Sequence, residues 1–189
     1  MSTRVIMIAA GPTPWDAEDR LVGNSSLPLT AEAMDAIRHL LDEVRTPITA
    51  VYRPAVNEAC TQAAQIISRK FSLRARDNAD LDEVGLGLWQ GLLPEEIRLR
   101  FPTVYRKWVE EPLLVTPPDG EPLEAAIQRI GGAARQIIRR NRGACIAMAL
   151  RPMALQIVAG ILHGRTSAEI AKSLHERQAM ETIEINEAG

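Results

Sequence analysis

Aromatic residues are scarce in this chain of 189 residues, because two Phe, two Tyr and three Trp make up only 4% of it. Proteins that bind single-stranded nucleic acids stack the bases on aromatic side chains, so the composition argues against such a platform. Basic blocks are also lacking, since 22 Lys and Arg stand against 24 Asp and Glu and give a net charge of −2. We therefore expect no nucleic-acid partner.

Cysteines and long apolar runs are rare as well. The two cysteines, Cys60 and Cys145, lie far apart in apolar surroundings, which favours buried reduced thiols over a disulfide or a metal site. The first apolar run, residues 5–10, is too short for a signal peptide or a membrane-spanning helix. With 46% hydrophobic and 24% charged residues, the composition is typical of a globular protein, and we expect a cytoplasmic location and no membrane partner.

Short apolar runs alternate with amphipathic helical patterns along the chain. Strands are predicted at residues 5–10, 48–52, 71–75, 144–150 and 181–185. Helices are predicted at residues 31–44, 55–70, 123–140, 152–162 and 167–174. This alternation indicates an α/β three-layer sandwich, with a mostly parallel central sheet flanked by helices.

Residues 81–122 have a different character. Glycines and prolines interrupt this stretch, and only short helices are predicted in it, around residues 94–101 and 105–108. We expect it to form a helical cap insertion over one end of the sheet, within a single domain that covers residues 1–189.

Several short fragments carry the functional signal. In order they read AAGPTPWD (9–16), DRLVG (19–23), PLT (28–30), YRPAVNEACT (52–61), LDEVGLGLWQG (81–91), PPDGEP (117–122) and ALRPM (149–153). They resemble the motifs of the histidine phosphatase superfamily, which has the phosphoglycerate mutase-like fold. The family opening, a strand followed by Arg-His-Gly-Glu-Thr-x-Trp-Asn, matches the first of them. This resemblance implies the family fold and a phosphatase or phosphomutase activity.

The resemblance also shows which family residues are missing. The family's Arg-His pair, which includes the nucleophile, matches Ala9 and Ala10; a second phosphate-binding Arg matches Asn57; and the second His matches Arg151. Of the family pocket only the carboxylate remains, at Glu83. Alanine offers no nucleophile and no charge, so phosphohistidine chemistry is excluded at this position, and no catalytic residue is expected.

Two new cations stand near the matched pocket. Arg53 and Arg151 both follow predicted strands, so their side chains lie at the carboxyl ends of the sheet, where α/β proteins bind ligands. One interpretation is an anion site, for phosphate or another small anion, made by Arg53, Glu83 and Arg151. The other is that the two arginines only neutralise the carboxylates of Glu83 or Asp16.

Other residues in the chain have simpler interpretations. Trp15, Trp89 and Trp108 can line a pocket, but packing is the favoured role. Cys60 is a poor substitute nucleophile, because its predicted helix carries it about two turns beyond the strand end. No magnesium-binding set accompanies Asp16, so no metal and no cofactor are expected.

The resulting hypothesis is a catalytically inactive histidine-phosphatase-like protein. Its role would be binding, regulation or assembly. A separate hypothesis is an interaction protein, either a homo-oligomer or bound to a protein partner, whose partner contacts the surface of the helix at 55–70 or of the strand at 181–185 and not the pocket. The alternative is a phosphatase or phosphomutase-type hydrolase in which Glu83 acts as acid or base, and Arg53 and Arg151 hold the phosphate while water attacks.

Overall fold

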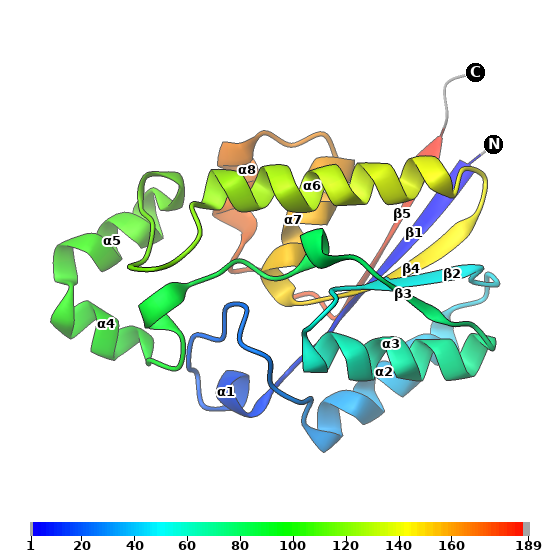
Figure 1. The fold of residues 1–189 in the computed structure, drawn as a ribbon, viewed down its shortest axis with the longest axis horizontal. Helices are drawn as coiled ribbons and strands as arrows, with labels where there is room; N and C mark the ends of the chain where they lie inside the picture. Colours follow the sequence, from blue (N-terminus) through cyan, green and yellow to red (C-terminus); the bar gives the residue numbers. More distant parts are fainter. Residues whose placement is uncertain (1, 187–189) are drawn as a thin grey trace.

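A five-stranded sheet forms the centre of the computed structural model, which describes residues 2–186 (Figure 1). The strand order is β3-β2-β4-β1-β5; four strands are parallel, and β5 pairs antiparallel with β1 at one edge. The strands are β1 (Ser2–Ala9), β2 (Ala50–Arg53), β3 (Ala75–Asp77), β4 (Cys145–Leu150) and β5 (Met180–Asn186). The α/β fold with a mostly parallel sheet flanked by helices is confirmed.

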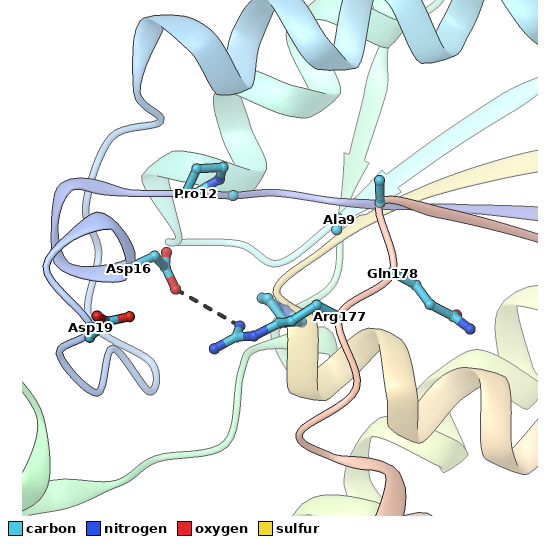
Figure 2. A pocket seen from close by; sticks show the side chains of 9 residues that line it. Ala9, Pro12, Asp16, Asp19, Arg177 and Gln178 are labelled. Atoms are coloured by element: carbon cyan, nitrogen blue, oxygen red, sulfur yellow. Dashed lines mark ion pairs between the residues drawn. The ribbon is translucent and has the colours of Figure 1, made fainter. Parts of the chain in front are cut away.

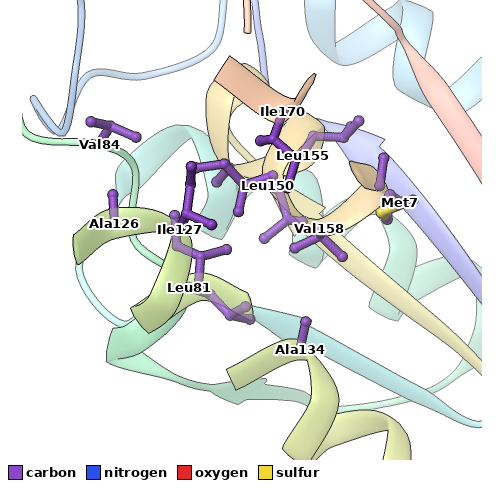
Figure 3. Close-up of a cluster of buried hydrophobic side chains, with 14 of the residues drawn as sticks. Met7, Leu81, Val84, Ala126, Ile127, Ala134, Leu150, Leu155, Val158 and Ile170 are labelled. Atoms are coloured by element: carbon purple, nitrogen blue, oxygen red, sulfur yellow. The ribbon is translucent and has the colours of Figure 1, made fainter. Parts of the chain in front are cut away.

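Side-chain alternation along β1 separates the two layers of helices. Ile6 and Ile8 join the cluster beneath α2 and α3, whereas Val5 and Met7 join the cluster beneath α6, α7 and α8 (Figure 3). Both faces of the strand are therefore apolar, as expected for a strand covered on both sides. The helices are α2 (Ala31–Glu43), α3 (Glu58–Phe71), α6 (Leu123–Arg140), α7 (Pro152–Leu162) and α8 (Ser167–Ser173).

Two predicted boundaries are wrong around α3. The helix expected at 55–70 begins at Glu58, because the side chain of Asn57 caps it by accepting a hydrogen bond from the backbone N–H of Cys60. It ends at Phe71, and Ser72 follows in the left-handed conformation with φ 55°. The strand predicted at 71–75 instead starts at Ala75, since Phe71 packs from the helix against the α2–α3 cluster.

Residues 79–122, which include the insertion predicted at 81–122, form short helical pieces connected by loops. They are 3₁₀ turns at η1 (Ala79–Leu81), η2 (Gly87–Trp89) and η3 (Pro112–Leu114), with the helices α4 (Pro94–Arg100) and α5 (Pro102–Glu110) between them. Trp108 on α5 packs edge-on against Trp89, with ring centroids 5.5 Å apart, and Tyr105 lies 6.2 Å from Trp108. These three rings attach α5 to the rest of the chain. Trp15 packs close to Gly91, so packing contacts are present for each of the three tryptophans whose favoured role is packing.

Gly87 allows this segment to approach the 117–120 turn. Its backbone has φ +52°, and a Cβ built on it would lie 2.1 Å from the carbonyl oxygen of Pro118. Only glycine fits there, because any side chain would meet backbone atoms in a conformation that is itself unfavourable for L-residues.

Within residues 2–186, none of the helices combines the length and the apolar character that a membrane crossing requires.

Candidate functional site

The candidate site lies where β1 and β4 end. Ala9 is the last residue of β1, Ala10 follows it fully buried, and Gly11 is joined to Pro12 by a cis peptide bond. The backbone comes so close to Arg151 here that a Cβ on Gly11 would lie 2.9 Å from Arg151 Nη1. The turn therefore presents backbone and small side chains to the residue that follows β4.

Arg151 fills the space beside this turn, and only 2% of it is exposed. Its Nη1 donates to the carbonyl oxygen of Ala10, and its Nη2 lies 3.1 Å and 2.9 Å from the two carboxylate oxygens of Asp16. Its Nε has no hydrogen-bond partner among the described residues. The guanidinium thus links the end of β1 to the loop that carries Asp16.

Asp16 is positioned by its own short helix, α1 (Pro14–Ala17). Its Oδ2 accepts hydrogen bonds from the backbone N–H and the hydroxyl of Thr13, which forms a capping box with it. Burial on its own would raise the pKa of the Asp16 carboxyl, but Arg151 and Thr13 outweigh burial and hold the pKa below its ordinary value. Asp16 therefore stays ionised and paired with Arg151.

Glu83 is the second buried carboxylate of the site, with 3% exposure. Its oxygens accept hydrogen bonds from three backbone N–H groups, those of Val84, Met153 and Ala154, at 2.8–2.9 Å. Two of these donors belong to the first turn of α7, where a carboxylate is favoured by the helix dipole. Burial nevertheless dominates and raises the pKa of Glu83 to about 7, although Arg151 and the N–H donors oppose the rise.

Replacing Glu83 by glutamine is expected to remove part of the pH dependence of stability. The folded-state pKa of about 7 exceeds the ordinary value of 4.5. The native state therefore holds a proton that the unfolded state has lost, and the free energy of unfolding falls as the pH rises between these values. Between pH 5 and pH 8, urea unfolding should show that the free energy of unfolding falls by about 2.5 kcal/mol more in the wild type than in Glu83→Gln.

All other titrating groups are shared by the two proteins, so the difference between them isolates Glu83. Parallel pH profiles for the wild type and Glu83→Gln would contradict the raised pKa of this residue.

Asn57, which matches the second phosphate-binding Arg of the resemblance, has a structural role here. It is 2% exposed, and its Oδ1 accepts a hydrogen bond from Cys60 N–H at 3.1 Å as the N-cap of α3. Cys60 itself is buried and free, like Cys145, and burial raises the pKa of the Cys60 thiol well above its usual range. Cys60 is therefore a core side chain and not an activated nucleophile.

Replacing Asn57 by alanine is expected to lower the free energy of unfolding by about 1 kcal/mol, because the first turn of α3 loses its capping acceptor. Asn57→Ser is the matched control, since its hydroxyl keeps a capping acceptor while, as in the alanine variant, the amide that donates to the carbonyl oxygen of Ser25 is lost. Urea denaturation measures both variants. Equal losses in the two variants would contradict the capping role.

Arg53 does not meet Arg151 in the structure. Its Nη1 donates to the carbonyl oxygens of Pro54 and Ala55 and to the hydroxyl of Thr61, and its Nη2 lies 3.0 Å from Asp77 Oδ1. It therefore holds the loop between β2 and α3 and the end of β3, and pairs with neither Glu83 nor Asp16. Of the two predicted cations, the structure brings only Arg151 next to Glu83 and Asp16.

Two cavities that share Asp16, Pro152 and Arg177 lie at this end of the sheet, and Arg151 lines the smaller one. The larger, which we call the outer pocket, has a volume of about 440 Å³ and lies beside the end of β1 (Figure 2). It is lined by Ala9, Gly11, Pro12, Asp16, Asp19, Pro152, Arg177, Gln178 and Ala179. The smaller, which we call the inner cavity, has a volume of about 100 Å³. It is lined by Asp16, Arg20, Leu21, Val22, Gly23, Glu83, Leu86, Trp108, Arg151, Pro152, Met153, Leu174, His175 and Arg177.

His175 and Arg177 are pocket residues that sequence reasoning missed. They lie on the irregular segment between α8 and β5, and His175 stacks edge-on against Trp108 with ring centroids 5.6 Å apart. Burial and, after it, the charge of Arg177 lower the pKa of His175, so its imidazole is neutral at pH 7. The segment shows no hydrophobic periodicity, and a histidine without a motif gave no signal in the sequence.

The structure is thus an α/β protein with two cavities at the carboxyl ends of its parallel strands. The family model of the histidine phosphatase superfamily (branch 1) matches residues 5–189. The chain therefore belongs to this superfamily, as the sequence motifs predict.

Several known proteins similar to this chain carry phosphatase names. Phosphoserine phosphatase 1 of Hydrogenobacter thermophilus is 24% identical over 139 residues, which cover 73% of this chain; the chain spans only 65% of that relative's length. Among solved structures, the alpha-ribazole phosphatase of Shigella flexneri matches with a TM-score of 0.80 at 21% identity, covering 97% of this chain and 91% of that chain.

A third similar structure is a mutant phosphoserine phosphatase of Entamoeba histolytica in complex with phosphoserine, in which a histidine is replaced by alanine. It matches with a TM-score of 0.75 at 16% identity and covers 95% of this chain and 89% of that chain. At these identities the solved structures show the shared fold.

Proposed function

We propose that this protein binds a phosphate ester or another small anion at the Arg151 site without forming a phosphohistidine. It would be an inactive member of its superfamily with a binding, regulatory or assembly role. One observation carries the proposal: Ala10 is fully buried at the position matched to the nucleophile, and the guanidinium of Arg151 occupies the space beside it, tied to Ala10 and Asp16.

Two features support ligand binding at this site. The Nε of Arg151, a residue that lines the inner cavity, has no acceptor among the described residues, and buried donors are normally paired. The Entamoeba histolytica mutant, in which a histidine is replaced by alanine, was solved with phosphoserine bound. Loss of a histidine is thus compatible with retained binding in this fold.

The second candidate is a phosphoric ester hydrolase with a remodelled site. The relatives favour it, since all three that we name are phosphatases. Glu83 supports it as well, because a carboxyl with a pKa of about 7 is suited to general acid–base catalysis near neutral pH. Arg151 would then hold the phosphoryl group while water attacks it.

Turnover of p-nitrophenyl phosphate and a panel of phosphate esters by the purified protein separates the two candidates. The binding proposal expects no turnover, together with a higher melting temperature in phosphate or sulfate. At a ligand concentration of about one hundred times Kd, binding raises the free energy of unfolding by about 2.7 kcal/mol. This corresponds to a rise in the melting temperature of roughly 5–10 °C. Turnover abolished by Glu83→Gln or Arg151→Ala, in variants that circular dichroism shows to be folded, would establish the hydrolase, and turnover that survives both points to a contaminant.

The assembly role is measured separately by light scattering or native mass spectrometry. A homo-oligomer or a captured protein partner supports it, and a monomer that binds only small anions restricts the role to ligand binding.

A further inference from the structure

The outer pocket presents two opposite charges that the Arg151–Asp16 pair leaves free for a ligand. Within residues 2–186, Asp19 forms no ion pair, and Arg177 forms only a long one, with Nη1 4.0 Å from Asp16 Oδ1. Asp16 is already neutralised by its closer pairing with Arg151. One cation and one carboxylate therefore line the same pocket at its solvent-exposed rim, where the Arg177 side chain is 72% exposed, and neither has a close ionic partner among residues 2–186.

These two charges come from different parts of the chain. Asp19 lies just after α1 and has a backbone φ of 57°. Arg177 extends from the segment before β5 toward Asp16 (Figure 2). Ala9, Gly11 and Ala179 leave the space beside them open, and a volume of about 440 Å³ is within the range of small-molecule sites. In the family motif an arginine stands at the position of Ala9, so a large side chain is missing where the pocket opens.

We propose that the outer pocket binds a zwitterionic ligand, with its anionic group on Arg177 and its ammonium group on Asp19. This inference rests on the proposed function: it places the ligand in the outer pocket, which shares Asp16, Pro152 and Arg177 with the cavity lined by Arg151, and narrows the ligand class to amine-bearing phosphate monoesters. A guanidinium binds phosphoryl oxygens through paired hydrogen bonds, and a carboxylate accepts from an ammonium group. A dianion without an amine would meet Asp19 as a repulsive charge.

Calorimetric titration with phosphoethanolamine and with glycerol 3-phosphate tests the inference, since only the first carries an amine. The wild type should bind phosphoethanolamine more tightly. Arg177→Gln should weaken the binding of both ligands about tenfold, because a charged hydrogen-bonding group is lost. Asp19→Asn should weaken the binding of phosphoethanolamine by roughly three- to fivefold, as expected for an exposed charge pair, and leave the binding of glycerol 3-phosphate unchanged.

Two remote variants serve as matched controls. Arg38 and Asp35 pair with each other on the exposed face of α2, so Arg38→Gln and Asp35→Asn change the net charge without touching the pocket. They should leave both affinities unchanged. A second readout is the proton NMR titration of His175, whose pKa should rise when a phosphoryl group offsets the charge of Arg177.

The outcomes distinguish this inference from the proposed function. Equal binding of the two ligands, unaffected by Arg177→Gln and Asp19→Asn, overturns the zwitterion site and leaves anion binding elsewhere around Arg151 standing. Absence of binding by phosphoethanolamine, glycerol 3-phosphate and inorganic phosphate overturns the proposed function itself.

Discussion

Replacing Arg151 by alanine is expected to lower the free energy of unfolding by about 3–5 kcal/mol, which is the usual cost of removing one partner of a buried ion pair. The variant leaves the carboxylate of Asp16 without its guanidinium and the carbonyl oxygen of Ala10 without its donor. For a chain of this size the melting temperature should fall by roughly 6–20 °C, measured by calorimetry or circular dichroism.

Two further variants make the result specific to the pair. Arg165→Ala removes an arginine from an exposed position and should change stability by less than about 0.5 kcal/mol. Asp16→Asn in the Arg151→Ala background should restore part of the loss, because the unpaired charge is gone. A loss below about 1 kcal/mol in Arg151→Ala would show that the guanidinium does not hold the two loops together.

Restoring the four family residues is expected to create phosphatase activity. The changes are Ala9→Arg, Ala10→His, Asn57→Arg and Arg151→His, and they supply a nucleophile and cations on a scaffold that keeps Glu83. Hydrolysis of p-nitrophenyl phosphate should exceed that of the matched triple variant, which retains Ala10, by on the order of a hundredfold. A phosphohistidine should be detectable by phosphorus NMR in the quadruple variant only.

Folding has to be checked in this experiment, because Asn57→Arg removes the cap of α3 and Arg151→His removes the pair with Asp16. Circular dichroism of the triple variant provides that control. A folded quadruple variant that neither hydrolyses the ester nor forms a phosphohistidine would show that these four side chains are not sufficient for activity on this scaffold.

The sheet and the long helices could be predicted because their patterns are local. The apolar run of β1 and the helical spacing of α6 indicate a buried strand and an amphipathic helix by themselves. The start of α3 was misplaced, since Pro54 also signals a helix start and the capping role of Asn57 depends on how the preceding turn folds.

The site was less accessible to sequence reasoning. Glu83 and Arg151 could be selected from the sequence, because Glu83 lies within a family motif and Arg151 directly follows a predicted strand. The structure brings both to the same cavity. Arg53 has the same kind of position, yet its direction is set by Asp77 and Thr61, which only tertiary structure supplies. His175 and Arg177 reach the pockets because their segment packs on Trp108, and no periodic pattern encodes that contact.

The ring contacts of Trp108 have an optical consequence. Its ring centroid lies 5.5 Å from that of Trp89, 6.2 Å from that of Tyr105 and 5.6 Å from that of His175, so it connects α5 to the segment that carries Arg177. A ligand that alters the charge or position of this segment changes the surroundings of Trp108. Trp108 lines the inner cavity, so a ligand bound there is expected to change the part of the intrinsic emission that comes from this one of the chain's three tryptophans.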